Sequence, residues 1–118
     1  MKVKCIKTVI KPKNKSVINY DVRGFISEND ILDVFGISIS DATVYVYVFN
    51  GEHLFDVPLD LFEILDTNIG LEWKIKKWSD KSITIWPELF YVDDFLENFA
   101  EREDKERELF ENLQDKIK

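Results

Sequence analysis

A tight hairpin is the clearest structural signal in this chain. Two β-prone runs, residues 42–49 and 52–57, flank Asn50 and Gly51, and Pro58 ends the second run. Asparagine and glycine tolerate the positive φ angles that a tight turn between antiparallel strands requires, so this pattern is the strongest short-range hairpin signal. The sequence therefore predicts an antiparallel sheet built around this hairpin.

Further strands are expected on both sides of it. Alternating polar and apolar residues, bounded by turn residues, indicate half-buried strands. The segments with this pattern are 2–9, 16–23, 63–66, 71–78 and 82–86, with a lysine-rich loop at 11–15 and one short turn at 58–62. The last two strands are expected to form a second hairpin, with Ile83 and Ile85 facing inward.

Residues 28–35 carry a different signal. Ser27 precedes this segment and Asp30 follows three residues later, which resembles the cap at the start of a helix. Apolar residues at helical spacing follow, and Gly36 fits a helix end. We expect a short helix here, and a strand stub over the alternating segment 37–40.

The chain is predicted to be helical from Val92 onward, since apolar residues recur at helical spacing. This stripe comprises Val92, Leu96, Phe99, Phe110, Leu113 and Ile117, and the charged run 101–108 interrupts it. Two arrangements remain open. The helix continues and presents its last apolar residues to a partner, or it breaks near residue 101 and folds back on its own core.

The expected fold is one α+β domain over residues 1–118, with a β-rich core over 1–90 and a helical part over 91–118. Two segments, MKVKCIK at 1–7 and VPLDLFEILD at 57–66, resemble small phage and bacterial proteins with an SH3-like barrel. In that family the first segment opens the barrel, and the second forms a short turn and the last strand. The resemblance implies a small antiparallel, partly SH3-like sheet or barrel with a C-terminal helix.

This chain departs from the family pattern over residues 10–50, which lack the usual glycine-containing loop before the second strand. Residues 73–95 look like uncharacterised bacterial proteins that pair a hairpin with a terminal helix. Neither resemblance implies a catalytic residue or an established function.

The net charge of −7 is unevenly distributed along the chain. The net charge is +6 over residues 1–23, −9 over 24–66, +2 over 67–86 and −6 over 87–118. Nucleic-acid phosphates would be repelled by most of this surface, whereas a basic protein partner would be attracted. The alternative is that the acidic surface only keeps the protein in solution.

No residue pattern predicts catalysis, a metal site or a cofactor. The chain has one cysteine, Cys5, and one histidine, His53, and nothing local marks either as activated. Asp93, Asp94 and Glu97 lack the spacing of a calcium loop and fit an acidic helix start instead. We therefore expect a protein that is not an enzyme.

The aromatic face of the first hairpin strand, Tyr45, Tyr47 and Phe49, has three alternative uses: a covered core, a protein contact or a base-stacking surface. The leading hypothesis is a protein-binding module, such as an immunity-type or phage-encoded inhibitor that acts by occlusion. Its expected partner contacts are Tyr45, Tyr47, Phe49, Asp56, Asp60, Glu63, Asp66 and Trp78.

Two other functions are weighed against this one. A homo-oligomer, for example a homodimer, would assemble through Phe110, Leu113 and Ile117. A nucleic-acid binder would use the lysines near the N-terminus and the Lys74, Lys76 and Lys77 face. The sequence shows neither a secretory signal nor an apolar run of membrane-spanning length, so we expect a cytoplasmic protein without membrane contact.

Overall fold

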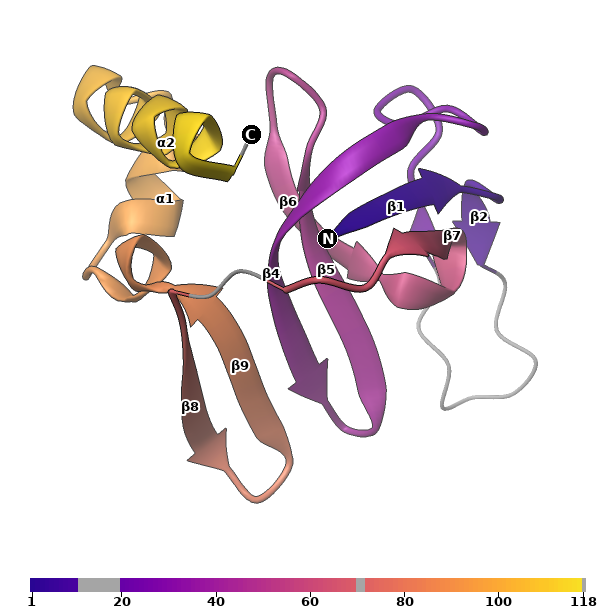
Figure 1. Cartoon of the computed structure of the whole chain (residues 1–118), viewed down its shortest axis with the longest axis horizontal. Helices are drawn as coiled ribbons and strands as arrows, with labels where there is room; N and C mark the ends of the chain where they lie inside the picture. The colour runs from indigo at the N-terminus through magenta and orange to yellow at the C-terminus, as the bar shows by residue number, and fades with distance from the viewer. Residues whose placement is uncertain (11–19, 70–71, 118) are drawn as a thin grey trace.

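The chain forms an α+β fold, a mostly antiparallel sheet followed by C-terminal helices (Figure 1). The computed structural model describes residues 1–10, 20–69 and 72–117, together with the side chains of these residues except that of Ile117. The expected loop 11–15 and the first residues of the expected strand 16–23 lie outside them. The strands are β1 (Lys2–Cys5), β2 (Val9–Ile10), β3 (Tyr20–Asp21), β4 (Ile31–Ser40), β5 (Thr43–Phe49), β6 (Leu54–Pro58), β7 (Phe62–Asp66), β8 (Trp73–Ser79) and β9 (Ser82–Pro87).

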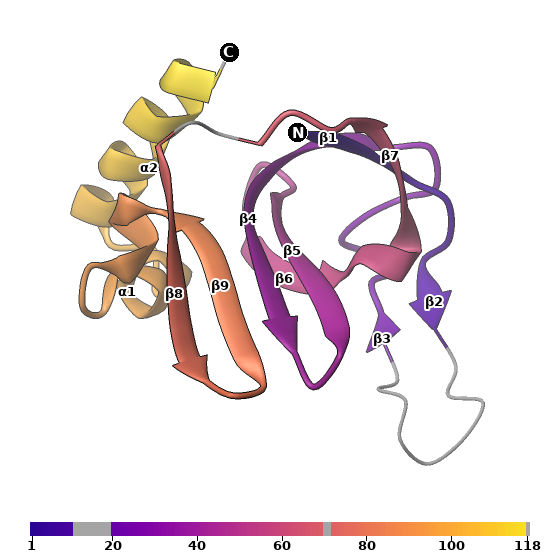
Figure 2. The same ribbon diagram turned by 60° about the horizontal axis from the view of Figure 1, so that its bottom comes forward.

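Strand β4 organises the sheet, because both of its edges are paired. One edge pairs with β5, while the other pairs first with β1 over residues 31–33 and then with β9 over residues 37–40. The main path runs β6-β5-β4-β1-β7, and β8 pairs with β9 beside it. Figure 2 shows the main path curving around a shared interior without closing, with the β8–β9 hairpin alongside β4.

A first apolar core fills the inside of this curved path. Alternate residues of each strand point inward, as the two-residue period of a strand requires. The buried members are Val3, Cys5, Val22, Ile26, Val34, Val46, Val48, Val57, Leu61 and Phe62. The valines of β5 therefore face this interior, and the aromatic residues of β5 face the other way.

A second core of aromatic rings covers the outer face of β4 and β5. The helices that supply it are the 3₁₀ helix η2 (Glu88–Tyr91) and the α-helices α1 (Phe95–Ala100) and α2 (Asp104–Ile117). Its buried members are Phe35, Phe90, Phe95, Phe99 and Phe110. Neighbouring residues of β4 serve different cores, since Val34 faces the first and Phe35 the second.

The expected helix over 28–35 is wrong, because this segment enters β4 instead. Ser27 and Asp30 do interact as a cap would, with the Ser27 N–H donating to Asp30 Oδ2 at 2.9 Å. The Asp30 N–H donates in turn to the Ser27 carbonyl at 3.1 Å, which closes a turn that leads into the strand. Main-chain pairing on both edges of β4 outweighs the local helical signal.

Both predicted hairpins are confirmed, with shifted bounds. The Asn50 side chain accepts hydrogen bonds from the N–H groups of Glu52 and His53, so the β5–β6 connection covers four residues. Two-residue turns lie instead between β4 and β5 and between β8 and β9, and in the first of them Asp41 and Ala42 both have positive φ. The short turn after Pro58 is the 3₁₀ helix η1 (Leu59–Leu61), and β7 follows as expected.

Other strand predictions need correction. The segment 2–9 is not one strand, because β1 ends at Cys5 and β2 pairs with β3 in a separate ribbon. In the second hairpin the buried residues of β9 are Thr84 and Pro87, while Ile83 and Ile85, which were expected to face inward, are only half-buried. Thr84 is on the side of β9 that faces η2, since its hydroxyl lies 2.8 Å from the Tyr91 hydroxyl.

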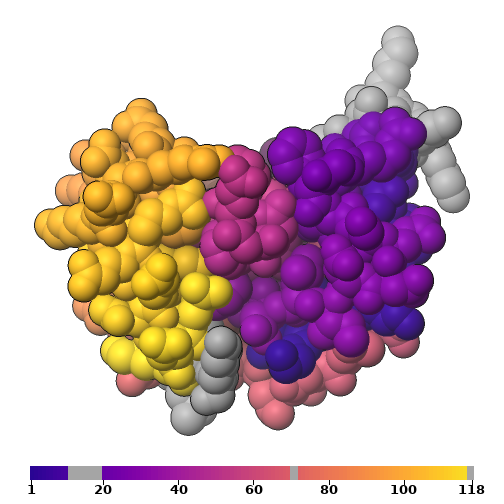
Figure 3. All heavy atoms as spheres, turned by 90° about the horizontal axis from the view of Figure 1, so that it is seen from above, coloured from indigo at the N-terminus to yellow at the C-terminus, as the bar shows by residue number. Residues whose placement is uncertain are grey.

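The C-terminal helix breaks and folds back, which was one of the two predicted arrangements. Helix α1 ends at Ala100, Arg102 has a positive φ of 64°, and α2 starts at Asp104. Arg107 then donates to the Glu52 carbonyl at 2.7 Å and to the Phe99 carbonyl at 3.0 Å, which ties the break to the β5–β6 connection. Figure 3 shows α2 lying against this connection. In the described part of the chain, no helix has the length and apolar character needed to cross a membrane.

Candidate functional site

The aromatic residues of β5, expected as partner contacts, are covered by the chain itself. Tyr45 is buried, and the Tyr47 ring packs edge-on against Trp86 and Phe90 at centroid distances of 5.7 and 5.5 Å. Phe49 packs in the same way against rings of the two helices. Of the three uses considered for this face, the structure shows the covered core: the Tyr20 ring packs against Tyr45, and Tyr47 and Phe49 pack against the second core.

The four expected acidic contacts do not form one uninterrupted acidic surface. Asp56 on β6 and Asp60 in η1 are exposed. On β7, Glu63 lies opposite Lys4, and Asp66 lies opposite Lys2. Acids of β7 therefore face lysines of β1 at this edge of the sheet, and of the four acids only Asp56 lines a hollow together with an exposed aromatic residue, Phe25.

The predicted oligomer contacts mostly serve the internal core. Phe110 is 1% exposed and packs at about 5 Å between centroids against Phe35, Phe49 and Phe99. Leu113 is partly buried against the same cluster. The side chain of Ile117 lies outside the described residues. Phe110 and Leu113 thus face inward, which corrects their expected role as outward contacts.

A shallow hollow of about 190 Å³ opens between β3 and β6, next to the turn that follows β3. We call this site the acidic hollow. Its lining residues are Tyr20, Asp21, Val22, Phe25, Phe55, Asp56 and Val57. It brings two carboxylates and three aromatic rings to one place, from segments far apart in the sequence.

Phe25 is the most prominent member of the acidic hollow. Its backbone is fixed, because its N–H donates to the Val22 carbonyl at 3.0 Å and its carbonyl accepts from Asn50 Nδ2 at 3.1 Å. Its ring nevertheless remains 53% exposed and meets the rings of His53 and Phe55 edge-on at 5.9 and 6.1 Å. An exposed aromatic side chain on a fixed backbone loses little entropy on binding, which favours contact with a partner.

The two carboxylates of the acidic hollow differ in their surroundings. Asp21 holds a forked hydrogen bond from Arg23, whose Nη2 lies 2.6 Å from Oδ2, and this bond lowers the pKa of Asp21 to about 2. Asp56 forms no ion pair with any residue that the structure describes. Its carboxylate is therefore the one whose charge is not already balanced by a described neighbour.

The field of Asp56 reaches three tyrosines. Burial raises the pKa values of Tyr20, Tyr45 and Tyr47, and the negative charge of Asp56 raises them further. Tyr47 lies directly opposite Asp56 in the β5–β6 pair. This side of β6 is thus an electronegative environment, which stabilises a nearby cation.

The remaining predicted contact, Trp78, lies on a separate surface formed by β8. Its ring is 51% exposed, its Nε1 donates to Thr84 Oγ1 at 2.9 Å, and Lys76 Nζ lies 3.7 Å from the ring centroid. The Tyr91 hydroxyl supports this arrangement, since it hydrogen-bonds to Thr84 Oγ1 and to the Lys74 carbonyl. Trp78 is therefore held by a hydrogen-bond network in a lysine-rich setting.

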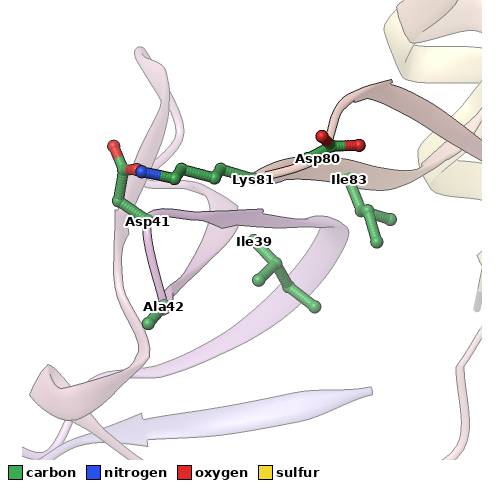
Figure 4. A pocket seen from close by; sticks show the side chains of 6 residues that line it. All are labelled: Ile39, Asp41, Ala42, Asp80, Lys81 and Ile83. Atoms are coloured by element: carbon green, nitrogen blue, oxygen red, sulfur yellow. The ribbon is translucent and has the colours of Figure 1, made fainter.

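A larger hollow of about 440 Å³ lies between the tips of the β4–β5 and β8–β9 hairpins, shown in Figure 4. Ile39 and Ile83, which are directly opposite one another in the β4–β9 pair, form its apolar floor. The Lys81 side chain extends toward Asp41 across the rim (Figure 4). With one lysine and two aspartates around an apolar floor, its rim offers no distinctive arrangement for catalysis.

The groups considered for chemistry are not brought together. Cys5 is buried in the first core, where its thiol donates to the Lys7 carbonyl at 3.3 Å, whereas His53 is half-exposed in the β5–β6 connection. Across residues 1–10, 20–69 and 72–117, no group of three histidine, cysteine or acidic side chains could hold a metal ion. Comparison with protein-family models, curated proteins and solved structures finds no match for this chain.

Sequence reasoning missed Tyr20, Asp21 and Phe25. The available signal was an aromatic residue directly after Gly24, in a turn that offers no strand or helix position to cover it. Their proximity to Asp56 depends on how β3 lies beside β6, which no local pattern specifies.

Proposed function

We propose that this protein is a protein-binding module that recognises a basic partner through the acidic hollow. The observation that carries the proposal is the pairing of Phe25, exposed on a fixed backbone, with the carboxylate of Asp56 in one hollow. The proposed action is occlusion, as in an immunity-type or phage-encoded inhibitor: the module covers a basic patch of its partner.

The chemistry of the hollow suits an arginine or lysine side chain. A cation is attracted to the faces of aromatic rings, and a carboxylate supplies a charge-assisted hydrogen bond. An arginine would satisfy both, because its planar guanidinium stacks on rings and donates in a fork. Asp21 is already engaged by Arg23, so Asp56 is the expected acceptor.

The test is a fluorescence-anisotropy titration with a labelled peptide of alternating arginine and glycine. We expect saturable binding that weakens with added salt, whereas a glutamate–glycine peptide of equal length does not bind. Phe25→Ala and Asp56→Asn should each weaken binding about 10- to 30-fold, as expected for loss of a central contact. The matched control Asp115→Asn removes an exposed acid on α2 and should leave the affinity unchanged.

Circular dichroism of each variant shows whether the fold is retained. The proposal fails if the arginine peptide does not bind, or if Asp115→Asn weakens binding as much as Asp56→Asn. If the arginine peptide binds as expected, affinity capture can identify the partner. The relevant proteins are those that the natural chain retains and the Phe25→Ala, Asp56→Asn double variant does not.

The finer description of the fold belongs to the same proposal. We infer that β1, β4, β5, β6 and β7 correspond to an SH3-like barrel. Two features support this inference: the strand order β6-β5-β4-β1-β7, and the 3₁₀ turn η1 between β6 and β7 at the segment that resembles the family. An experimental structure in which β6 and β7 diverge rather than approach would contradict it.

A further inference from the structure

Strand β8 leaves one edge of the sheet open. It pairs with β9 on one side, and no other described strand pairs with it. Every side chain from Lys74 to Ser79 is exposed, and Ile75 reaches 73% exposure. The outer edge therefore offers main-chain N–H and C=O groups to an added strand, which is a common way of binding an extended peptide.

The side chains of β8 give this edge a positive charge. Lys74 and Lys76 lie on one face of the strand together with Trp78, while Ile75 and Lys77 lie on the other. Lys77 is close to Asp80 at 3.5 Å, but Lys74 and Lys76 have no ion pair with a described residue. Residues 67–86 as a whole carry a net charge of +2 within a chain of net charge −7.

This charge pattern argues against pairing with a second copy of the same strand. In an antiparallel pair of β8 strands centred on Lys76, that lysine faces its own copy. In a pair centred on Ile75, Lys74 faces Lys76. Like charges directly opposite one another destabilise a sheet, so the same lysines that would attract an acidic strand disfavour self-association.

We propose that the outer edge of β8 binds an extended acidic segment of another protein, which adds to the sheet as a further strand. Carboxylates at alternate positions of that segment would face Lys74 and Lys76, and its intervening apolar residues would lie beside Ile75. Trp78, fixed by Thr84 and Tyr91, would cover the end of the added strand. This surface is distinct from the acidic hollow and of opposite charge.

The test uses a labelled peptide of alternating glutamate and valine, measured by fluorescence anisotropy at low salt. We expect saturable binding, and at least a 10-fold loss of affinity with Lys76→Glu. The matched control Lys105→Glu makes the same charge change at an exposed position near the start of α2 and should leave the affinity unchanged. The same peptide N-methylated at alternate residues should not bind, because it lacks the main-chain donors that strand addition requires.

Amide hydrogen exchange gives a second measurement, in which β8 amides should become protected when the peptide is present. The proposal is overturned if the glutamate–valine peptide does not bind, since the lysines then serve only to block edge pairing. Equal binding of the N-methylated peptide also overturns it. So does a single-stranded oligothymidylate that binds more tightly than the glutamate–valine peptide and loses this binding with Lys76→Glu.

Discussion

A β-carbon added at Gly36 would lie 2.8 Å from Cδ1 of Trp86. Gly36 is on β4 and Trp86 on the neighbouring strand β9, so the missing side chain makes room for the indole ring. The ring has little freedom to move aside, because its Nε1 donates to Ser38 Oγ at 3.1 Å and Tyr47 and Tyr91 contact its faces and edges. Gly36 is thus required by side-chain packing, at a bulge in β4.

We expect Gly36→Ala to lower the free energy of unfolding by about 1–3 kcal/mol, the usual cost of an overpacked core. Denaturant unfolding followed by tryptophan fluorescence measures the change. In a double-mutant cycle with Trp86→Leu, the two effects should be less than additive, because the smaller side chain relieves the clash. Strict additivity would show that the glycine is needed for another reason.

At Ala42, in the β4–β5 turn, a glycine is expected to stabilise the fold. Its φ of 66° lies in the left-handed region, where a β-carbon is unfavourable and glycine is not. Ala42→Gly should therefore raise the free energy of unfolding by about 0.5–1 kcal/mol, despite the greater freedom of glycine in the unfolded chain. Ala100→Gly, an exposed helical position in α1, is the control and should lower it by about 1 kcal/mol. A loss of stability in both variants would contradict the turn geometry.

Phe110 tests the packing of the C-terminal helix. Phe110→Ala should lower the free energy of unfolding by about 3–5 kcal/mol, because it leaves a cavity among the three aromatic rings that contact Phe110. The neighbouring half-exposed residue provides the comparison, since Leu109→Ala should cost less than about 1 kcal/mol. Light scattering should give the natural chain and Phe110→Ala the same mass. A smaller mass for Phe110→Ala would instead support the hypothesis that Phe110 contacts a second copy of the chain.

The tyrosines near Asp56 give the stability a dependence on alkaline pH. Their pKa values are raised in the folded chain, so the neutral phenols stabilise the fold fully below pH 10, and this contribution is lost as the pH rises above that value. Asp56→Asn removes one cause of the shift. We expect tyrosinate absorbance to appear at lower pH in Asp56→Asn than in the natural chain, with Asp115→Asn unchanged. Identical titration curves for all three would exclude an effect of Asp56.

The parts of the fold that were predicted correctly rest on local chemistry. Asn50 and Pro58 fix turns within a few residues, so both neighbouring strands could be found from the sequence. The first part of β4 was mistaken for a helix, because the Ser27–Asp30 turn before it resembles a helix cap and its pairing partner β1 is distant in sequence. Residues 37–40, in the second part of β4, were expected as a strand from their alternation, and they form one. The helix break was left open, since it depends on Arg107 reaching the β5–β6 connection.

The candidate site was also harder to predict, because it depends on contacts between segments that are distant in sequence. Four acids of the run 24–66 were expected as partner contacts, but folding places two of them, Glu63 and Asp66, beside lysines of β1. Of the expected contacts, Asp56 and Trp78 lie on the two surfaces proposed for binding, and Phe25 came only from the structure. Alternation assigns residues to two faces of a strand, but it does not show which face another element will cover.

One edge of β4 pairs with both β1 and β9, and this has a consequence for how the protein unfolds. Neither the curved strands nor the second hairpin can detach without breaking main-chain bonds to this same strand. Loss of order in one part therefore exposes the other, and the molecule should melt in a single transition. The amides at the middle of β4, near the change of partner, should be among the last to exchange with solvent.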